Sequence, residues 1–150
     1  MKRYLLDTSI LSLLAPGRSG VSERLSEWLR ARSDRLFVST ITVTEIQQGI
    51  CKLRRSGAEQ RADILAAWLH ELVETGGDRI VGFDTSAAMK AGEISDLAIS
   101  RGRHPGFPDI AIAAIGAAFD MEILTLNVRH FEPLEVSVAD PSAVEFPVSN

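Results

Sequence analysis

The stretch "YLLDTSIL", residues 4–11, places a carboxylate in the middle of an apolar run. The residues before Asp7 are typical of a strand in a buried sheet, and "TSIL" is expected to begin a helix. An ionised side chain is costly in such a place unless it is paired or bound to a cation. Asp7 therefore needs a partner that the apolar run itself does not supply.

Further short apolar runs follow along the chain, separated by helical patterns. Strands are predicted at residues 3–6, 36–39, 80–83, 123–126 and, on a weaker pattern, 134–138. Most of these runs lack apolar–polar alternation, which favours strands covered on both faces. Apolar residues recur at helical spacing between the strands, and segment 109–119, "DIAIAAIGAAF", is predicted to be a central buried helix. This order of elements favours an α/β sandwich with a mainly parallel sheet.

Composition limits the classes of function. The 150 residues are predicted to form one domain, residues 1–150, and a formal net charge of −4 argues against a generic basic nucleic-acid coat. An enzyme acting on nucleic acid stays open, because clustered carboxylates raise the acidic count. Cys51 is the only cysteine, which excludes a disulfide framework and favours a reducing compartment. Asp7 interrupts any signal-peptide pattern, and no apolar segment approaches the ~20 residues that span a bilayer. We expect a soluble cytoplasmic protein with no membrane partner.

Four oxygen-bearing side chains are expected at one edge of the sheet, where ligands of parallel sheets bind. They are Asp7 after the first strand, Glu45 early in the helix after the second strand, Asp109 at the start of the buried helix and Asn127 after the fourth strand. Each also has an ordinary interpretation. Asp7 and Asp109 could cap helices, Glu45 could be a solvated helix residue, and Asn127 could be a turn residue. These interpretations do not explain why all four should share one edge.

Convergence of carboxylates is unfavourable without a counter-ion. Two carboxylates ~4 Å apart repel by ~4 kcal/mol at an effective dielectric constant near 20. A divalent cation turns this repulsion into binding energy, and oxygen ligands suit Mg²⁺ or Mn²⁺. Such an ion can activate water and stabilise a phosphoryl transition state. The sequence therefore predicts that a metal ion neutralises Asp7.

The stretches "LLDTSIL", "STITVTEIQQGI", "PDIAIAAIG" and "ILTLNVRHF" resemble, in order and over nearly the whole chain, the four motifs of the PIN domain family. The likeness is closest to VapC-type toxins of bacterial toxin–antitoxin pairs. It implies a three-layer α/β/α sandwich and a Mg²⁺- or Mn²⁺-dependent endoribonuclease. It also implies a homodimer and a cognate antitoxin whose tail enters the active-site groove.

Residue by residue, Asp7, Glu45 and Asp109 match the three acids most regularly present in the family. Asn127 matches a fourth position that is often Asp; because Asn brings no charge, the expectation is one ion, or a second one recruited with the RNA. The implied mechanism is hydrolysis by a water on an ion held by Asp7 and Asp109. Glu45 either ligates the ion or orients the water as a base. The hydroxyls of the next two residues, Thr8 and Ser9, could orient Asp7 or a bound water, or cap the following helix.

Substrate contacts are expected from cations near the acids. The loop "SRGRHPGF" places Arg101 and Arg103 just before Asp109, and Arg129 lies two residues after Asn127. These three arginines, together with Thr8 and Ser9, are the candidates for substrate binding, although a basic loop can also be merely solvated. The histidines are scattered without the spacing of metal ligands, and surface positions are expected for them.

Two other classes of protein are alternatives to this hypothesis. A haloacid-dehalogenase-type phosphatase would need a second Asp at position 9, where Ser9 stands, and a response-regulator receiver would need an acidic pair near Asp7. A non-catalytic PIN-like module that binds RNA or protein is the remaining alternative. Asn127 is the one feature that favours it.

Overall fold

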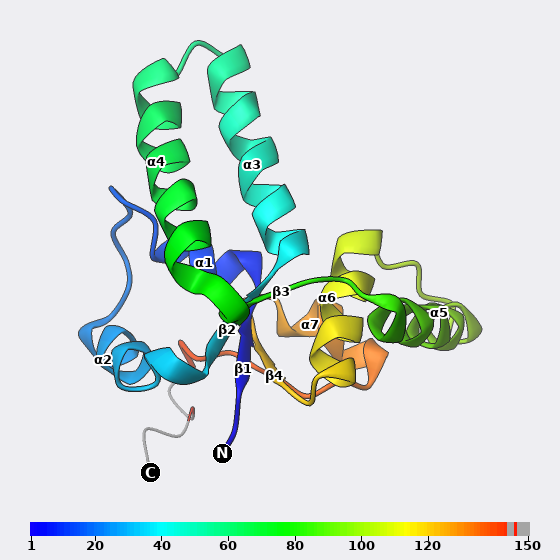
Figure 1. The fold of residues 1–150 in the computed structure, drawn as a ribbon. Coiled ribbons are helices and arrows are strands. Elements are labelled where there is room, and N and C mark those ends of the chain that lie inside the picture. Colours follow the sequence, from blue (N-terminus) through cyan, green and yellow to red (C-terminus); the bar gives the residue numbers. More distant parts are fainter. Residues whose placement is uncertain (144–145, 147–150) are drawn as a thin grey trace.

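The computed structural model describes residues 1–143 and 146, which form a five-stranded sheet with helices on both faces (Figure 1). Its strands are β1 (Tyr4–Leu6), β2 (Leu36–Ser39), β3 (Ile80–Val81), β4 (Glu122–Leu124) and β5 (Val138–Ala139). Its helices are α1 (Thr8–Leu13), α2 (Glu23–Ala31), α3 (Thr40–Arg55), α4 (Glu59–Gly76), α5 (Thr85–Ser100), α6 (Phe107–Ala118) and α7 (Val128–Phe131). Short 3₁₀ turns η1 (Ser33–Arg35), η2 (Gly77–Arg79) and η3 (Glu132–Leu134) complete the described part.

All neighbouring strands run parallel, in the order β3-β2-β1-β4-β5. Leu5 in the central strand pairs with Phe37 on one side and with Ile123 on the other. The chain builds the sheet from β1 towards β3 and then returns to add β4 and β5 on the opposite side. The switch point therefore lies between β1 and β4, and ligands of such sheets bind there, beyond the carboxyl ends of the strands. The predicted α/β sandwich with a parallel sheet is confirmed.

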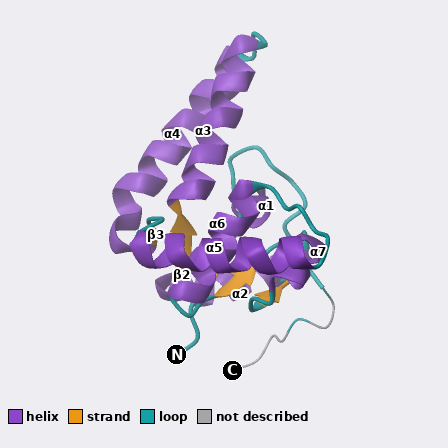
Figure 2. Cartoon of the chain, turned by 90° about the vertical axis from the view of Figure 1, so that its right-hand side faces the viewer, coloured by secondary structure: helices purple, strands orange, loops and turns teal. Residues whose placement is uncertain are grey.

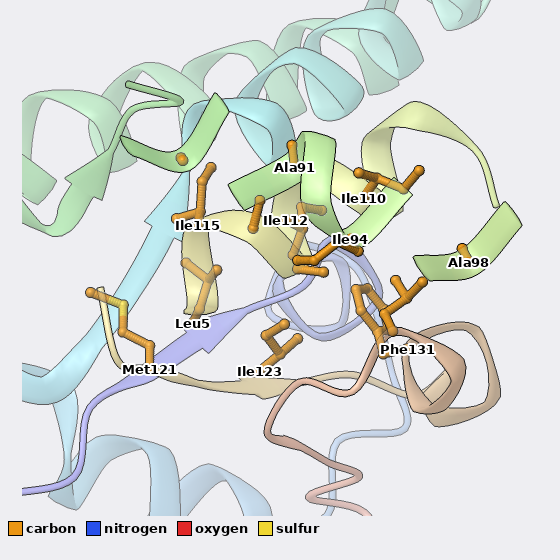
Figure 3. Packing of buried hydrophobic residues seen from close by; sticks show 14 residues of the cluster. Leu5, Ala91, Ile94, Ala98, Ile110, Ile112, Ile115, Met121, Ile123 and Phe131 are labelled. Carbon is orange, nitrogen blue, oxygen red and sulfur yellow. The ribbon is translucent and has the colours of Figure 1, made fainter. Parts of the chain in front are cut away.

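Alternate residues of β1 enter two separate hydrophobic clusters. Leu5 is fully buried with residues of α5 and α6, including Ile94 and Ile112 (Figure 3). Tyr4 and Leu6 are buried on the other face with residues of α1 and α2. Both faces of the strand are thus covered, which explains why the run before Asp7 shows no polar alternation.

Helix α6 is the central buried helix that the sequence predicts at residues 109–119. Its residues from Ile110 to Gly116 are all buried. Gly116 packs directly on β4, since a Cβ there would lie 2.9 Å from Ile123 Cγ1. The close approach fixes the position of α6 relative to the carboxyl ends of β1 and β4.

Helices α3 and α4 form a hairpin that projects beyond the sheet (Figures 1 and 2). Ile50, Ala62 and Leu69 are buried between the two helices. Helix α3 begins directly after β2, where the Ser39 side chain caps it by accepting from Thr42 N at 3.1 Å. The base of α3 is therefore held at the carboxyl edge of the sheet. Although α4 has 18 residues, no helix in the described part is apolar enough to cross a bilayer.

The predicted strands after the second differ from the structure in their bounds, and the third ends at Val81 instead of residue 83. The fourth ends at Leu124 instead of residue 126, so two residues separate it from Asn127. The prediction for 134–138 is wrong except at Val138, because the chain forms η3 and then takes a left-handed conformation at Glu135 (φ 56°). Leu134 is apolar because it anchors this turn in the core, where it is 2% exposed.

Candidate active site

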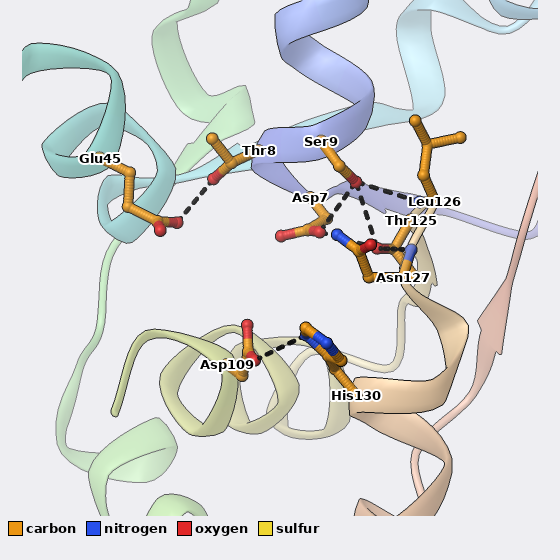
Figure 4. Close-up of polar contacts among 9 residues, drawn as sticks. All are labelled: Asp7, Thr8, Ser9, Glu45, Asp109, Thr125, Leu126, Asn127 and His130. Carbon is orange, nitrogen blue, oxygen red and sulfur yellow. Dashed lines mark hydrogen bonds and ion pairs between the residues drawn. The ribbon is translucent and has the colours of Figure 1, made fainter. Parts of the chain in front are cut away.

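Asp7 lies at the switch point, directly after β1. Its backbone N–H donates to Leu124 O at 2.9 Å, and the residue is only 6% exposed. It occupies the N-cap position of α1, but its side chain makes no capping bond. The carboxylate Oδ2 instead accepts hydrogen bonds from the hydroxyls of Ser9 at 3.0 Å and Thr125 at 2.7 Å (Figure 4). Helix capping by its side chain therefore does not account for Asp7.

The two hydroxyls tie Asp7 to the segment after β4. Ser9 Oγ accepts from Leu126 N and Thr125 Oγ1 accepts from Asn127 N, each at 3.0 Å. The hydroxyls of Ser9 and Thr125 have one proton each, and both protons can be donated to Asp7. The two hydroxyl oxygens, which lie 3.2 Å apart, then share no proton and form no hydrogen bond with each other. The network orients Asp7 through Oδ2 and leaves Oδ1 available to a ligand.

Sequence reasoning did not identify Thr125, which lay inside the predicted fourth strand. It is fully buried, and its only signal in the sequence is its place near the carboxyl end of that strand, two residues before Asn127. Thr125→Val keeps the shape of the side chain but removes the donor to Asp7. We expect a 10–100-fold loss of divalent-metal affinity, the usual effect of removing a group that orients a ligand.

Calorimetric titration with Mn²⁺ measures this effect, and Thr125→Ser is the matched control because it keeps the hydroxyl. Wild-type affinity is expected for the Ser variant. Equal affinities of the Val and Ser variants would contradict an orienting role for the Thr125 hydroxyl.

Glu45 reaches the same region from the base of α3. It is half-buried, and its Oε1 accepts a hydrogen bond from Thr8 Oγ1 at 2.7 Å. Thr8 Oγ1 also lies 3.1 Å from the hydroxyl of the fully buried Thr42. Thr8 thus positions Glu45, while Ser9 positions Asp7. Glu45 is held towards the start of α1, which differs from the ordinary interpretation of a solvated helix residue.

Asp109 is in the first turn of α6, whose N-cap residue is Gly106 and whose first turn contains Pro108. The alternative of Asp109 as the helix cap is therefore wrong. Its Oδ2 lies 3.3 Å from Nδ1 of His130, a side chain that is 60% exposed. Burial raises the pKa of Asp109 above its usual value, His130 lowers this pKa, and the nearby charge of Asp7 raises it.

Asp109→Asn is expected to raise the melting temperature of the metal-free protein at pH 7. A carboxyl whose pKa is raised by folding adds stability below its unfolded pKa, here 3.8, and loses it as pH rises through the folded pKa. The ionised Asp109 therefore disfavours the fold at pH 7, and Asn removes that charge. The gain should shrink towards pH 4.

Thermal unfolding in EDTA at the two pH values measures this difference. The control is Asp96→Asn, which changes an exposed carboxylate on α5. A lower melting temperature for Asp109→Asn than for wild type at pH 7 would show that the contact with His130 outweighs burial and repulsion.

Asn127 is exposed and precedes α7 without a side-chain capping bond. Its side chain lies beside Asp7 in Figure 4, so the structure brings it to the same edge as the acids.

Asp7, Glu45 and Asp109 face a common space from three different elements (Figure 4). Within the described residues, no three acidic, histidine or cysteine side chains lie close enough to hold an ion as they stand. Glu45 is engaged by Thr8 and Asp109 by His130. The buried Asp7 has no cationic partner among the ion pairs of the described part and has a like charge nearby. This all-oxygen donor set fits a hard divalent cation.

The three predicted substrate-binding arginines separate into two groups. Arg103 and Arg129 line the same cavity as Asp109. Arg101 instead forms an ion pair with Glu135 at 2.5 Å. The first two are therefore beside the acids, and the third is neutralised by a carboxylate.

Comparisons with known proteins assign the chain to a family. The family model described as PIN domain matches residues 4–133. The plasmid stability protein StbB of Pseudomonas syringae pv. tomato is 28% identical over 139 aligned residues, and the match covers 91% of this chain and 96% of that protein. The structure of FitAcB from Neisseria gonorrhoeae is 27% identical with a TM-score of 0.74, and the match covers 92% of this chain and 97% of that one. DNA-bound VapBC from Salmonella typhimurium, at 24% identity, shares the fold with a TM-score of 0.75 over 94% of this chain and 99% of that one. Because the family model spans most of its length, the chain belongs to the PIN domain family.

Proposed function

We propose that the chain is a Mg²⁺- or Mn²⁺-dependent endoribonuclease and the toxin component of a type II toxin–antitoxin pair. The observation that carries the proposal is the buried Asp7 carboxylate, which faces Glu45 and Asp109 at the carboxyl edge of the parallel sheet. Membership of the PIN domain family supports a metal-dependent nuclease. The resemblance of four motifs to VapC-type toxins supports a cognate antitoxin.

Each polar residue of the site has a proposed role. Asp7, Glu45 and Asp109 would hold the ion, and Asn127 could add a carbonyl oxygen. The bound ion would lower the pKa of a water and offset the charge of the phosphoryl transition state. Glu45 acts either as a ligand or as the base that orients the attacking water. The neighbouring hydroxyls described above hold Asp7 and Glu45 in position.

The proposed setting is the cytoplasm, where RNA is the substrate and the antitoxin is made. A homodimer is proposed from the same resemblance. A non-catalytic PIN-like module that binds RNA or protein is the competing possibility, and it predicts no metal site at these acids.

Calorimetric titration with Mn²⁺ tests the proposal without knowledge of the RNA target. The purified, antitoxin-free chain is expected to bind saturably, and Asp7→Asn and Asp109→Asn should each weaken binding by more than about tenfold. Asp96→Asn, which removes a similar charge from the exposed face of α5, should bind as wild type does. Absence of binding by a folded wild type would overturn the metal-nuclease proposal and favour the non-catalytic module.

A further inference from the structure

A basic cavity of about 320 Å³ adjoins Asp109. Among the residues that line it are the basic side chains Arg103, His104, Arg129 and His130. Asp109 is its acidic member and is already in contact with His130. The cavity therefore gathers positive charge on a chain whose formal net charge is −4.

The two arginines of the cavity have no partner in the described part of the chain. Neither Arg103 nor Arg129 takes part in a side-chain hydrogen bond or ion pair there. Arg101, on the same loop as Arg103, does have one, because Glu135 neutralises it. Arg129 also lines an adjacent hollow with Asp140 but forms no ion pair with it. Two unpaired guanidinium groups at one cavity repel each other and attract an anion.

The backbone that carries each arginine is anchored. Helix α5 ends in a Schellman motif, in which Arg103 N donates to Ala98 O at 2.8 Å and Gly102 N donates to Ile99 O at 2.9 Å. Gly102 takes the left-handed conformation that this motif needs (φ 70°). The backbone of Arg103 is thus set by the helix end. The position of Arg103 at the cavity is therefore fixed by the end of α5.

Arg129, the other arginine of the cavity, belongs to α7, a helix of only 4 residues. The fully buried Phe131 anchors α7 in the cluster that contains Ile123 and Leu134. Both segments that carry an arginine are therefore tied to the core.

We propose that Arg103 and Arg129 bind the phosphate backbone of the RNA strand where it leaves the acidic site past Asp109. The inference rests on the proposed nuclease function, because it takes the scissile bond to lie among the acids. Arginine suits this role, since its planar fork donates two hydrogen bonds to a phosphate. His104 and His130 add ring faces on which an unpaired base can stack. Contacts of this kind position the strand without reading its sequence.

Fluorescence anisotropy with a labelled, mixed-sequence single-stranded RNA tests the inference. The full chain is used in EDTA, so that binding is measured without metal-dependent cleavage. Each of Arg103→Gln and Arg129→Gln should weaken RNA binding by about tenfold, because a hydrogen bond to a charged group is lost. Each should also lower the slope of log Kd against log salt by about 0.7, the value for one phosphate contact on a single strand.

Two matched controls separate a site from general attraction. Arg101→Gln removes an ion-paired arginine from the same loop, and Arg55→Gln removes an exposed arginine from the far end of α3. Both should bind RNA as wild type does, to within about twofold. Equal losses in the controls, or no loss with Arg103→Gln and Arg129→Gln combined, would overturn the inference. Loss of binding to an acidic peptide in the combined variant, with RNA binding unchanged, would overturn it in favour of a protein-binding cavity.

Mn²⁺ titration of the same variants keeps this inference separate from the proposed function. Arg103→Gln and Arg129→Gln should leave Mn²⁺ affinity unchanged. If Mn²⁺ binding is retained and RNA affinity does not change in either arginine variant, only the inference about the cavity is overturned. If the wild type binds RNA, both arginine variants weaken that binding, and the wild type does not bind Mn²⁺, only the proposed nuclease function is overturned.

Discussion

Asp7→Asn is expected to lower the rate of RNA cleavage at saturating Mn²⁺ by at least about 10²–10³-fold. A metal ion stabilises the charge of a phosphoryl transition state by several kcal/mol, and each ~1.4 kcal/mol lost costs tenfold in rate. Asn has nearly the same shape as Asp, and its amide oxygen can still accept from the hydroxyls of Ser9 and Thr125. The charge is therefore removed while the local hydrogen bonds remain.

The fold should tolerate this substitution, because an ionised side chain that is 6% exposed is replaced by a neutral one. Circular dichroism and thermal unfolding in EDTA check that the variant is folded. Cleavage of total bacterial RNA by antitoxin-free protein is the measurement, and Asp96→Asn is the control for loss of one negative charge. Cleavage at the wild-type rate by a folded Asp7→Asn variant would place the chemistry elsewhere in the molecule.

Phe131→Ala is expected to lower the free energy of unfolding by about 3–5 kcal/mol, the usual cost of truncating a buried phenylalanine. Phe131 is fully buried and packs in the cluster that contains Leu5 and Ile123. Small domains are stable by only about 5–15 kcal/mol, so this loss is a large share of the total. A helix as short as α7 has no stability of its own, so Arg129 and His130 should lose their positions as well.

Urea unfolding followed by circular dichroism measures the change, with the midpoint expected to fall at a constant m-value. Phe107→Ala is the matched control, because Phe107 is 61% exposed. Its ring makes an edge contact with Phe83, with 5.7 Å between the ring centroids. It should cost about 1 kcal/mol or less. Equal losses in the two variants would mean that Phe131 does not anchor the core.

The helices and the first four strands could be predicted because their signals are local. Apolar residues recur at helical spacing within each helix, and each of these strands is a short run that is apolar by itself. The fifth strand could not be placed in this way. Leu134, Val136 and Val138 alternate as a half-buried strand would, but Leu134 and Val136 are apolar because they pack against the core outside any strand. The alternation was produced by tertiary packing.

The candidate site likewise has a part that the sequence predicts and a part that it does not. Asp7, Glu45 and Asp109 stand at recognisable places relative to strands and helices, so topology alone brought them to one edge. Their hydrogen-bond partners were not recognisable, since a Thr that positions a carboxylate looks in a sequence like any other Thr. The sequence also could not predict that Arg101 is ion-paired whereas Arg103 is not, because this difference depends on Glu135 in a later turn.

By itself, the sequence determined that a carboxylate follows a buried strand, because the strand-forming run and Asp7 are adjacent in the chain. Only the tertiary structure decided which groups surround that carboxylate. Thr125 donates to Asp7 across 118 positions because the register of β1 and β4, which pairs Leu6 with Leu124, places the next residues side by side. Strand register is set by the packing of the whole core, and no short segment of sequence contains that information.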